Sequence, residues 1–203
     1  MDNKEIKKVQ YVKYLGLKID EKLTWREHSL ELQGKLRKLN YLFYHLKKHM
    51  NVKHLKKIYS PLYESVFNYG IIHWGASKHI GPLRVLQNKV CRTILSLGAR
   101  AKESEIYSKM GVKRLDQVHK IRLMMFLFKN KGFFELHNTK LSTRLSKTEM
   151  AVYPGWKKEH ARMQGRYQGF QIFNRLPQVC RGEKRINAFK KQMTAHIVEH
   201  QNI

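Results

Sequence analysis

Carboxylate side chains are scarce in this sequence. The 203 residues include 15 aspartates and glutamates against 41 lysines and arginines, which gives a formal net charge of +26. A compact chain with that charge repels itself unless polyanions neutralise it. Because the basic residues are spread along the whole length, nucleic acid is the partner that the composition favours. Two alternatives stay open: a merely soluble basic surface, and an anionic membrane surface, which apolar helix faces suited to a buried core disfavour.

Cysteine is almost absent, since Cys91 and Cys180 are far apart and each stands alone. This excludes a disulfide framework and fits no zinc spacing, so two reduced thiols in an intracellular protein are the better interpretation. No apolar run approaches the roughly 20 residues of a membrane span. The charged segment 1–10 lacks the apolar core of a signal peptide. We therefore expect an intracellular protein, nuclear or cytoplasmic or both, without a membrane partner.

Clustered carboxylates, which two-metal polymerases and nucleases need, are also missing. The chain has three separated aspartates: Asp2, Asp20 and Asp116. Asp20-Glu21 is the only adjacent acidic pair, and a turn explains Asp20 better than catalysis does. His45 and His49 are four residues apart, but lysines surround them and the glutamate of the zinc-protease motif is absent. We therefore expect no catalytic residue, no metal site and no cofactor in this chain.

Strand and helix signals predict a mainly α fold. Residues 9–19 are rich in aromatic and β-branched types, which predicts a strand, and a turn follows at 20–22. Thr24 and Glu27 have the spacing of a capping box, which predicts a helix with Thr24 at its N-cap and with Trp25 in the core. Apolar residues at steps of three and four, such as Leu36 and Phe43 in the first helix, predict helices over 24–46, 51–66, 82–97, 103–110, 114–131 and 186–197. Asn51 is a candidate cap for the second of these.

Glycine and proline predict where these helices break. Pro61 should kink the second helix, whose expected inner face includes Leu62. The segment 70–81 predicts a loop or broken segment with an exposed Trp74. Pro82 suits the first turn of the third helix. C-terminal stops are expected at Gly98, Gly111 and Gly132.

Periodicity fades over 137–183, where glycines and prolines recur, so we expect irregular structure there, with short strands as an option. The expected architecture is a short N-terminal β element, a helical bundle and a partly irregular tail with a C-terminal helix. The expected domain ranges are 1–23, 24–135 and 136–203.

Basic residues interleave with aromatics along the predicted helices. Lys35 and Lys38 lie off the apolar stripe of the first helix, and Arg84, Lys89 and Arg92 lie off that of the third. Lysine and arginine on helices can follow a phosphate backbone without reading sequence. Three aromatics are candidates for stacking on bases or sugars: Tyr69, Trp74 and Trp156. Any one of them is more often a packing residue, so the pattern indicates backbone binding rather than base readout.

Several motifs stand in a distinctive order. The run Tyr14-Leu15-Gly16-Leu17-Lys18-Ile19-Asp20 precedes Leu23-Thr24-Trp25 and His28. Further along come Tyr69-Gly70, Trp74-Gly75, Leu86-Gln87-Asn88-Lys89, Arg92, Thr143-Arg144 and Phe173-Asn174-Arg175-Leu176-Pro177. This order resembles the region that follows the palm in jockey-type non-LTR retrotransposon reverse transcriptases. The resemblance covers residues 11 to about 180.

The resemblance implies a thumb and post-thumb region that holds the template–product duplex against an active site. It makes 1–23 the end of the palm, 24–135 a thumb-like domain and 136–203 a post-thumb tail, and it adds Arg144 to the candidate nucleic-acid-binding residues. The implied partners are RNA, DNA or an RNA–DNA hybrid, and the missing polymerase domains of the parent protein. The family's catalytic aspartates match nothing here, so Mg²⁺ would belong to the missing palm and we expect no polymerase activity from this chain alone.

Three interpretations remain open from sequence. The chain could be a piece of such a retrotransposon protein, a host-retained binding module for RNA or DNA, or a small enzyme of an unrecognised kind. The lack of clustered carboxylates argues against the third. The first two rely on the same physical interaction with nucleic acid.

Overall fold

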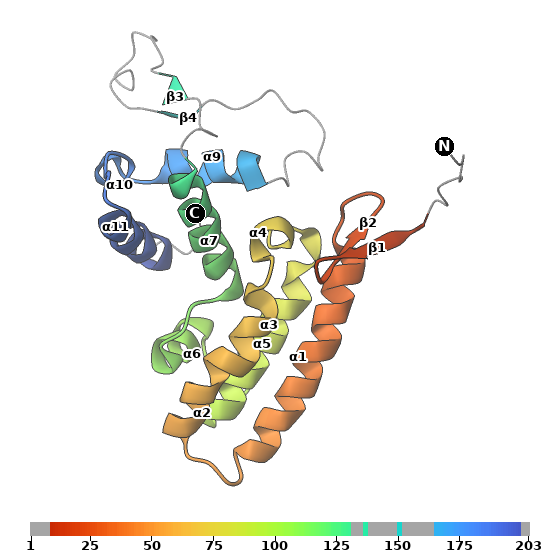
Figure 1. The fold of residues 1–203 in the computed structure, drawn as a ribbon. Helices are drawn as coiled ribbons and strands as arrows, with labels where there is room; N and C mark the ends of the chain where they lie inside the picture. The colour runs from red at the N-terminus through yellow and green to blue at the C-terminus, as the bar shows by residue number, and fades with distance from the viewer. Residues whose placement is uncertain (1–8, 131–135, 138–149, 152–164, 200–203) are drawn as a thin grey trace.

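The computed structural model describes residues 9–130, 136–137, 150–151 and 165–199. A two-stranded antiparallel hairpin at the N-terminal end leads into a series of helices, and a helix lies at the C-terminal end (Figure 1). The mainly α fold with a short N-terminal β element is therefore confirmed. Within the described ranges, no helix is both long and apolar enough to cross a membrane.

The N-terminal β element is a hairpin rather than the single strand expected over 9–19. Strand β1 (Tyr11–Tyr14) pairs with β2 (Leu17–Asp20), so that Tyr11 lies opposite Asp20. Leu15 and Gly16, with φ of 45° and 79°, form the two-residue connection. Positive φ at both positions matches the twist of the flanking strands, and glycine adopts it without steric cost.

Helix α1 (Arg26–Leu46) has Trp25 rather than the expected Thr24 at its N-cap, and Asp20 holds the turn before it. The Asp20 carboxylate accepts hydrogen bonds from the backbone N–H groups of Thr24, at 2.9 Å, and Trp25, at 2.7 Å. Burial acts to raise the pKa of Asp20, but these hydrogen bonds outweigh it and lower that pKa. The turn role expected for Asp20 is confirmed, and the capping box is wrong because Trp25, at φ 62°, holds the N-cap position.

The next helical segment runs through a π-helical turn at the expected kink. Asn51 caps helix α2 (Val52–Tyr59) as its side chain accepts from the His54 N–H at 3.0 Å. Pro61 lies in η1 (Ser60–Glu64), and α3 (Ser65–Asn68) follows. The wider turn shifts the helix face, so the expected inner position of Leu62 is wrong and its side chain is 39% exposed. Tyr63 and Phe67 are buried instead.

The segment 70–81 contains two short helices, α4 (Ile71–Trp74) and η2 (Lys78–Ile80). The expected exposure of Trp74 is wrong, since its side chain is 1% exposed and its Nε1 donates to the Tyr69 carbonyl at 3.0 Å. Gly70, at φ 61°, reverses the backbone after α3. This turn directs the Trp74 ring toward His28, with the two ring centroids 5.8 Å apart. A local pattern of glycines could not show that contact.

Three longer helices follow: α5 (Gly81–Leu95), α6 (Glu103–Met110) and α7 (Leu115–Lys129). Pro82 lies in the first turn of α5, as expected. Ser96, in the left-handed conformation, ends α5 two residues before the expected stop at Gly98. Gly111 ends α6 as expected. Helix α7 ends at Lys129, and the expected stop at Gly132 lies outside the described residues.

The tail is more helical than expected. Strands β3 (Leu136–His137) and β4 (Met150–Ala151) pair, while α9 (Gly165–Arg175), α10 (Gln178–Arg181) and α11 (Ile186–Glu199) are helices. The irregular structure expected over 137–183 is therefore wrong for α9 and α10. Gly169 looked like a helix breaker but lies at a close helix contact: a Cβ there would be 1.9 Å from a methyl group of Leu127 on α7.

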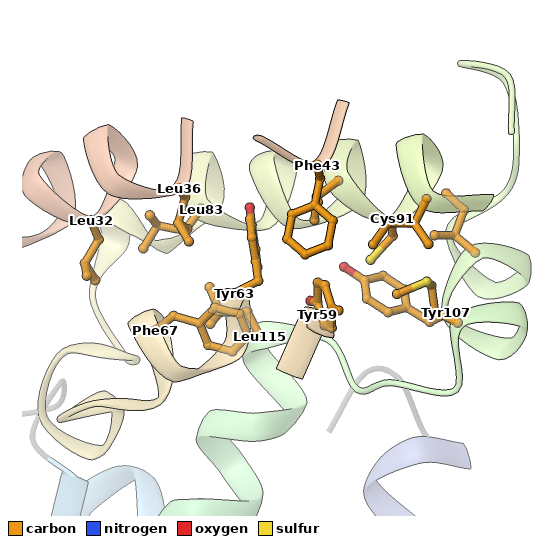
Figure 2. Packing of buried hydrophobic residues seen from close by; sticks show 14 of the residues in the cluster. Leu32, Leu36, Phe43, Tyr59, Tyr63, Phe67, Leu83, Cys91, Tyr107 and Leu115 are labelled. Carbon is orange, nitrogen blue, oxygen red and sulfur yellow. The ribbon is translucent and has the colours of Figure 1, made fainter. Parts of the chain in front are cut away.

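Two hydrophobic clusters meet along α7. The first lies between α1, α2, η1, α5 and α6 and contains Leu36 and Phe43 from the expected stripe of α1, while Trp25 is only partly buried against it. Figure 2 shows Phe43, Tyr59 and Tyr63 packed between the helices; the last two rings stack 5.3 Å apart. The second cluster joins α7 to α9, α10 and α11. The expected domain ranges stay predictions.

Candidate nucleic-acid interface

Most carboxylates in the described part of the chain are already bound to partners within it. Glu31 pairs with Lys35 and Lys18, and Glu105 pairs with Lys109. Further ion pairs are Arg84–Glu103, Arg114–Glu103, Arg114–Asp116 and Arg185–Glu183. Because so few acids are present, many exposed basic side chains lack an internal counter-charge. The protein surface therefore carries positive charge that an external polyanion can neutralise.

The outer face of α1, the turn after it and α2 carry a long run of sequence that is rich in basic residues and has no acid. No aspartate or glutamate occurs between Glu31 and Glu64. Eleven basic or histidine side chains lie in that interval: Lys35, Arg37, Lys38, His45, Lys47, Lys48, His49, Lys53, His54, Lys56 and Lys57. We call this the α1–α2 basic surface; it includes the turn that joins the two helices (Figure 1).

The two α1 lysines singled out from sequence have different surroundings. Lys35 is exposed, but its Nζ lies 2.7 Å from the Glu31 carboxylate, one helical turn away. That hydrogen bond is the main cause of the lowered pKa of Glu31. Lys38 is exposed and has no carboxylate partner among the described residues. Lys38 can therefore bind a phosphate without first breaking an internal ion pair, whereas Lys35 cannot.

The three candidate residues on α5 also differ in whether they have partners within the protein. Arg84 lies 4.0 Å from Glu103 of α6, and Arg92 donates to the Ala101 carbonyl at 3.4 Å. Both arginines therefore face α6 and the segment before it. Lys89 is exposed and makes no ion pair within the residues that the structure places. The structure thus brings Arg84 and Arg92 to a contact between helices and leaves Lys89 on the surface.

Arg84 also belongs to a group of cations at the junction of α5, α7 and α9. Lys120 of α7 is half-buried, and burial lowers the pKa of its amine. The charges of Arg114, Arg175 and Arg84 lower that pKa further, while Asp116 opposes them. Positive groups from distant parts of the chain therefore act on Lys120, which no local sequence pattern indicated.

The aromatic candidates chosen from sequence are not available as expected. Trp74 is buried, and Trp156 lies outside the described residues. Tyr69 is exposed, but its hydroxyl donates to the Leu15 carbonyl and its ring packs against Gly16. Tyr69 therefore holds the hairpin against the helices. None of the three is shown as a stacking surface.

Two other tyrosines on α1 are much more exposed and were missed from sequence. Tyr41 is 68% exposed and Tyr44 is 56% exposed. His45 lies between them, with ring centroids 4.3 Å from Tyr41 and 5.5 Å from Tyr44. The Lys48 amine lies 5.5 Å from the centroid of the Tyr44 ring. Both tyrosines lie off the apolar stripe that contains Leu36 and Phe43, and that position was the sequence signal for their exposure.

The five candidate residues that the structure describes do not form one contiguous site. Lys35 and Lys38 lie on α1, which packs on α5 through contacts such as the hydrogen bond from Asn40 to the Leu86 carbonyl. Arg84 and Arg92 face α6, on a different side of α5 (Figure 1). Arg144 lies outside the described residues. Lys38, with Tyr41 one turn later, is the candidate that belongs to the α1–α2 basic surface without an ion pair.

No group of three potential metal ligands from histidine, cysteine, aspartate and glutamate occurs in the described ranges. Buried histidines occur elsewhere, and burial lowers the pKa of both His28 and His119. Comparisons with protein-family models, curated proteins and solved structures found no match to this chain.

Proposed function

We propose that this chain binds the phosphate backbone of RNA, DNA or an RNA–DNA hybrid through the α1–α2 basic surface and Lys89. The proposal extends to the origin suggested by the motifs: the template–primer-binding, thumb and post-thumb part of a jockey-type non-LTR reverse transcriptase. In that setting the catalytic palm and its Mg²⁺ belong to other parts of the polymerase. The role places the protein in the nucleus or the cytoplasm.

The observation that carries the proposal is the separation of charge on the surface. Most described acids are held in ion pairs or hydrogen bonds, whereas Lys38, Lys48 and Lys89 are exposed without a carboxylate partner in the described part of the chain. Lysine amines on helices contact phosphates as point charges, and such contacts carry no base information. Binding driven by these residues is therefore expected to depend strongly on salt and weakly on sequence.

The dependence of nucleic-acid affinity on salt concentration tests the proposed phosphate contacts directly. Each phosphate neutralised on B-form DNA contributes about −0.9 to the slope of log affinity against log salt, so contacts to about five phosphates predict a slope of roughly −4 to −5. Replacing Lys38, Lys48 and Lys89 together with alanine should flatten that slope by up to about 3 units, equally on unrelated duplexes. Titrations by fluorescence anisotropy at several salt concentrations measure the effect.

Paired cations supply the matched control. Lys109 and Arg185 are exposed but bound to Glu105 and Glu183, so Lys109→Ala with Arg185→Ala should leave the slope nearly unchanged. Changing Arg84, Lys89 and Arg92 together would be a poorer test, because it also removes contacts of α5 to Glu103 and Ala101. Equal slopes for the parent and the triple lysine variant would refute the assignment of this surface.

The alternative is a stand-alone binding module derived from such an element. The first hydrophobic cluster favours it in one respect, because Leu36, Phe43 and Tyr59 are fully buried by other parts of this chain. The same surface would serve either protein. The nucleotide sequence upstream of the reading frame distinguishes them, since a retrotransposon origin predicts polymerase sequence with paired aspartates there.

A further inference from the structure

The outer face of α1 exposes a cluster of aromatic rings near its C-terminal end. Tyr41 and Tyr44 are 68% and 56% exposed, and the His45 ring contacts both. The Tyr41 and His45 rings are inclined at 59°, and those of Tyr44 and His45 at 89°. The three rings support one another on the helix surface and do not contribute to the buried cluster, which α1 reaches through Leu36 and Phe43.

Exposure of this size leaves much of each tyrosine side chain accessible to a ligand. The hydroxyls of Tyr41 and Tyr44 make no hydrogen bond within the described ranges, so neither side chain anchors another element. Residues three apart on a helix are neighbours, which places the two rings on one continuous patch. Contacts with His45 restrict their motion, and a restricted ring loses less conformational entropy when a ligand stacks on it.

The charge around the rings selects the ligand. Lys38 lies three residues before Tyr41 on the same helix, and the Lys48 amine lies over the Tyr44 ring. Acidic residues are absent from the whole interval between Glu31 and Glu64. Exposed aromatic faces bordered by cations, without a nearby carboxylate, fit a polyanion that carries flat groups. Single-stranded nucleic acid has that chemistry, because every base presents a π-face beside a phosphate.

We propose that Tyr41 and Tyr44 stack unpaired bases of single-stranded RNA or DNA, while Lys38 and Lys48 bind the adjoining phosphates. This inference deepens the proposed backbone binding and rests on it, since both use the α1–α2 basic surface. It adds that the surface distinguishes a strand with accessible bases from a duplex. A fully paired duplex hides its base faces and can offer this patch only phosphates.

The test compares strands that have the same phosphates but different bases. Affinity of the full chain is measured for an oligodeoxythymidylate of about 12 nucleotides, within the size range of single-strand sites, and for an abasic strand of equal length. Stacking on an aromatic side chain changes affinity by roughly 5-fold to 150-fold per base, so the abasic strand should bind more weakly by at least that lower factor. Equal affinities would overturn the proposal.

Matched variants then assign the stacking to these rings. Tyr41→Leu with Tyr44→Leu removes the rings but keeps apolar bulk, and it should abolish the preference for bases without changing duplex binding. Tyr41→Phe with Tyr44→Phe keeps the rings and should retain the preference. A leucine variant that still prefers bases would overturn the assignment, as would equal losses on single-stranded and duplex probes.

Cross-linking of the unchanged protein gives a result that does not depend on folded variants. A strand containing bromouracil should form its photo-cross-link within residues 41–45, whereas a cross-link confined to other segments would overturn the proposal. Failure of stacking remains distinguishable from failure of backbone binding. In the first case the abasic and thymidylate strands bind alike but the triple lysine variant still flattens the duplex salt slope; in the second that slope is also unchanged.

Discussion

Gln87 is the side chain whose replacement should disturb the fold most specifically. It lies in α5 and is 1% exposed. Its Nε2 donates to the Tyr59 hydroxyl at 3.1 Å and to the Lys113 carbonyl at 3.0 Å. Its Oε1 accepts from the Tyr107 hydroxyl at 3.0 Å and from the Leu115 N–H at 2.9 Å. One amide thus joins α5 to α2, α6 and the start of α7.

Gln87→Leu keeps the volume of the side chain but removes all four hydrogen bonds. The Tyr107 hydroxyl retains the Asn88 side chain as a partner, at 2.5 Å. The Lys113 carbonyl and the Leu115 N–H lose the partner on which they depend, and the Tyr59 hydroxyl loses a donor. A buried polar group left without a partner costs about 1–3 kcal/mol, so we expect unfolding to become easier by about 3–5 kcal/mol. That is a large share of the roughly 5–15 kcal/mol that stabilises a typical domain.

Urea unfolding followed by circular dichroism measures this loss, provided that the dependence on urea concentration stays unchanged. Gln33→Leu is the matched control. Gln33 is also buried on a helix, but its hydrogen bonds to Ser29 and Arg37 are long, at 3.5 Å and 3.4 Å. We expect the control to cost less than about 1 kcal/mol. Similar losses in the two variants would refute the reasoning, because burial alone and not the four-way connection would then set the cost.

Two further predictions concern stability. Burial lowers the pKa of His119 to about 4 from an ordinary value of 6.5, so the unfolded chain takes up this proton first as pH falls. Stability should therefore fall by about 3 kcal/mol between pH 6.5 and 4, and His119→Asn should remove most of that dependence in urea titrations at several pH values; a parallel pH profile for the variant would contradict this. Gly70→Ala should destabilise the fold by about 1–2 kcal/mol, because φ is 61° there and a Cβ would lie 2.7 Å from a Leu17 methyl group. Gly98→Ala, where nothing lies within 4 Å and φ is not positive, should be neutral, and equal thermal shifts for both alanine variants would show that the turn at Gly70 is not strained.

Local sequence patterns correctly indicated much of the helical framework. The periodic stripe placed Leu36 and Phe43 in the core, Asn51 capped a helix and Gly111 ended one. Each of these features depends on residues within a few positions of each other, so the chain carries the information locally. The same holds for the net charge of +26, which is a property of composition and needs no fold.

Predictions from a glycine and from a capping motif were wrong where another residue made a contact that the motif did not show. Gly169 resembled a helix breaker, yet its missing side chain admits Leu127 of another helix. Thr24 had capping-box spacing, but the Asp20 carboxylate binds the backbone N–H groups of Thr24 and Trp25, and Trp25 holds the N-cap position instead. In the first case a contact between two helices, and in the second a turn that the local pattern did not show, outweighed the intrinsic preference of the residue.

The sequence by itself determined that the chain is strongly basic, mainly helical and poor in clustered carboxylates. Only the tertiary structure decided which basic and aromatic side chains remain exposed. In the sequence, Arg84, Arg92 and Lys89 looked equivalent on one helix. In the structure, Arg84 pairs with Glu103 of α6, Arg92 donates to the Ala101 carbonyl just before α6, and Lys89 stays exposed. Trp74 looked exposed and is buried, whereas Tyr41 and Tyr44 are open to solvent. The physical reason is that burial and ion pairing depend on which helices meet, and that depends on contacts between residues far apart in the chain.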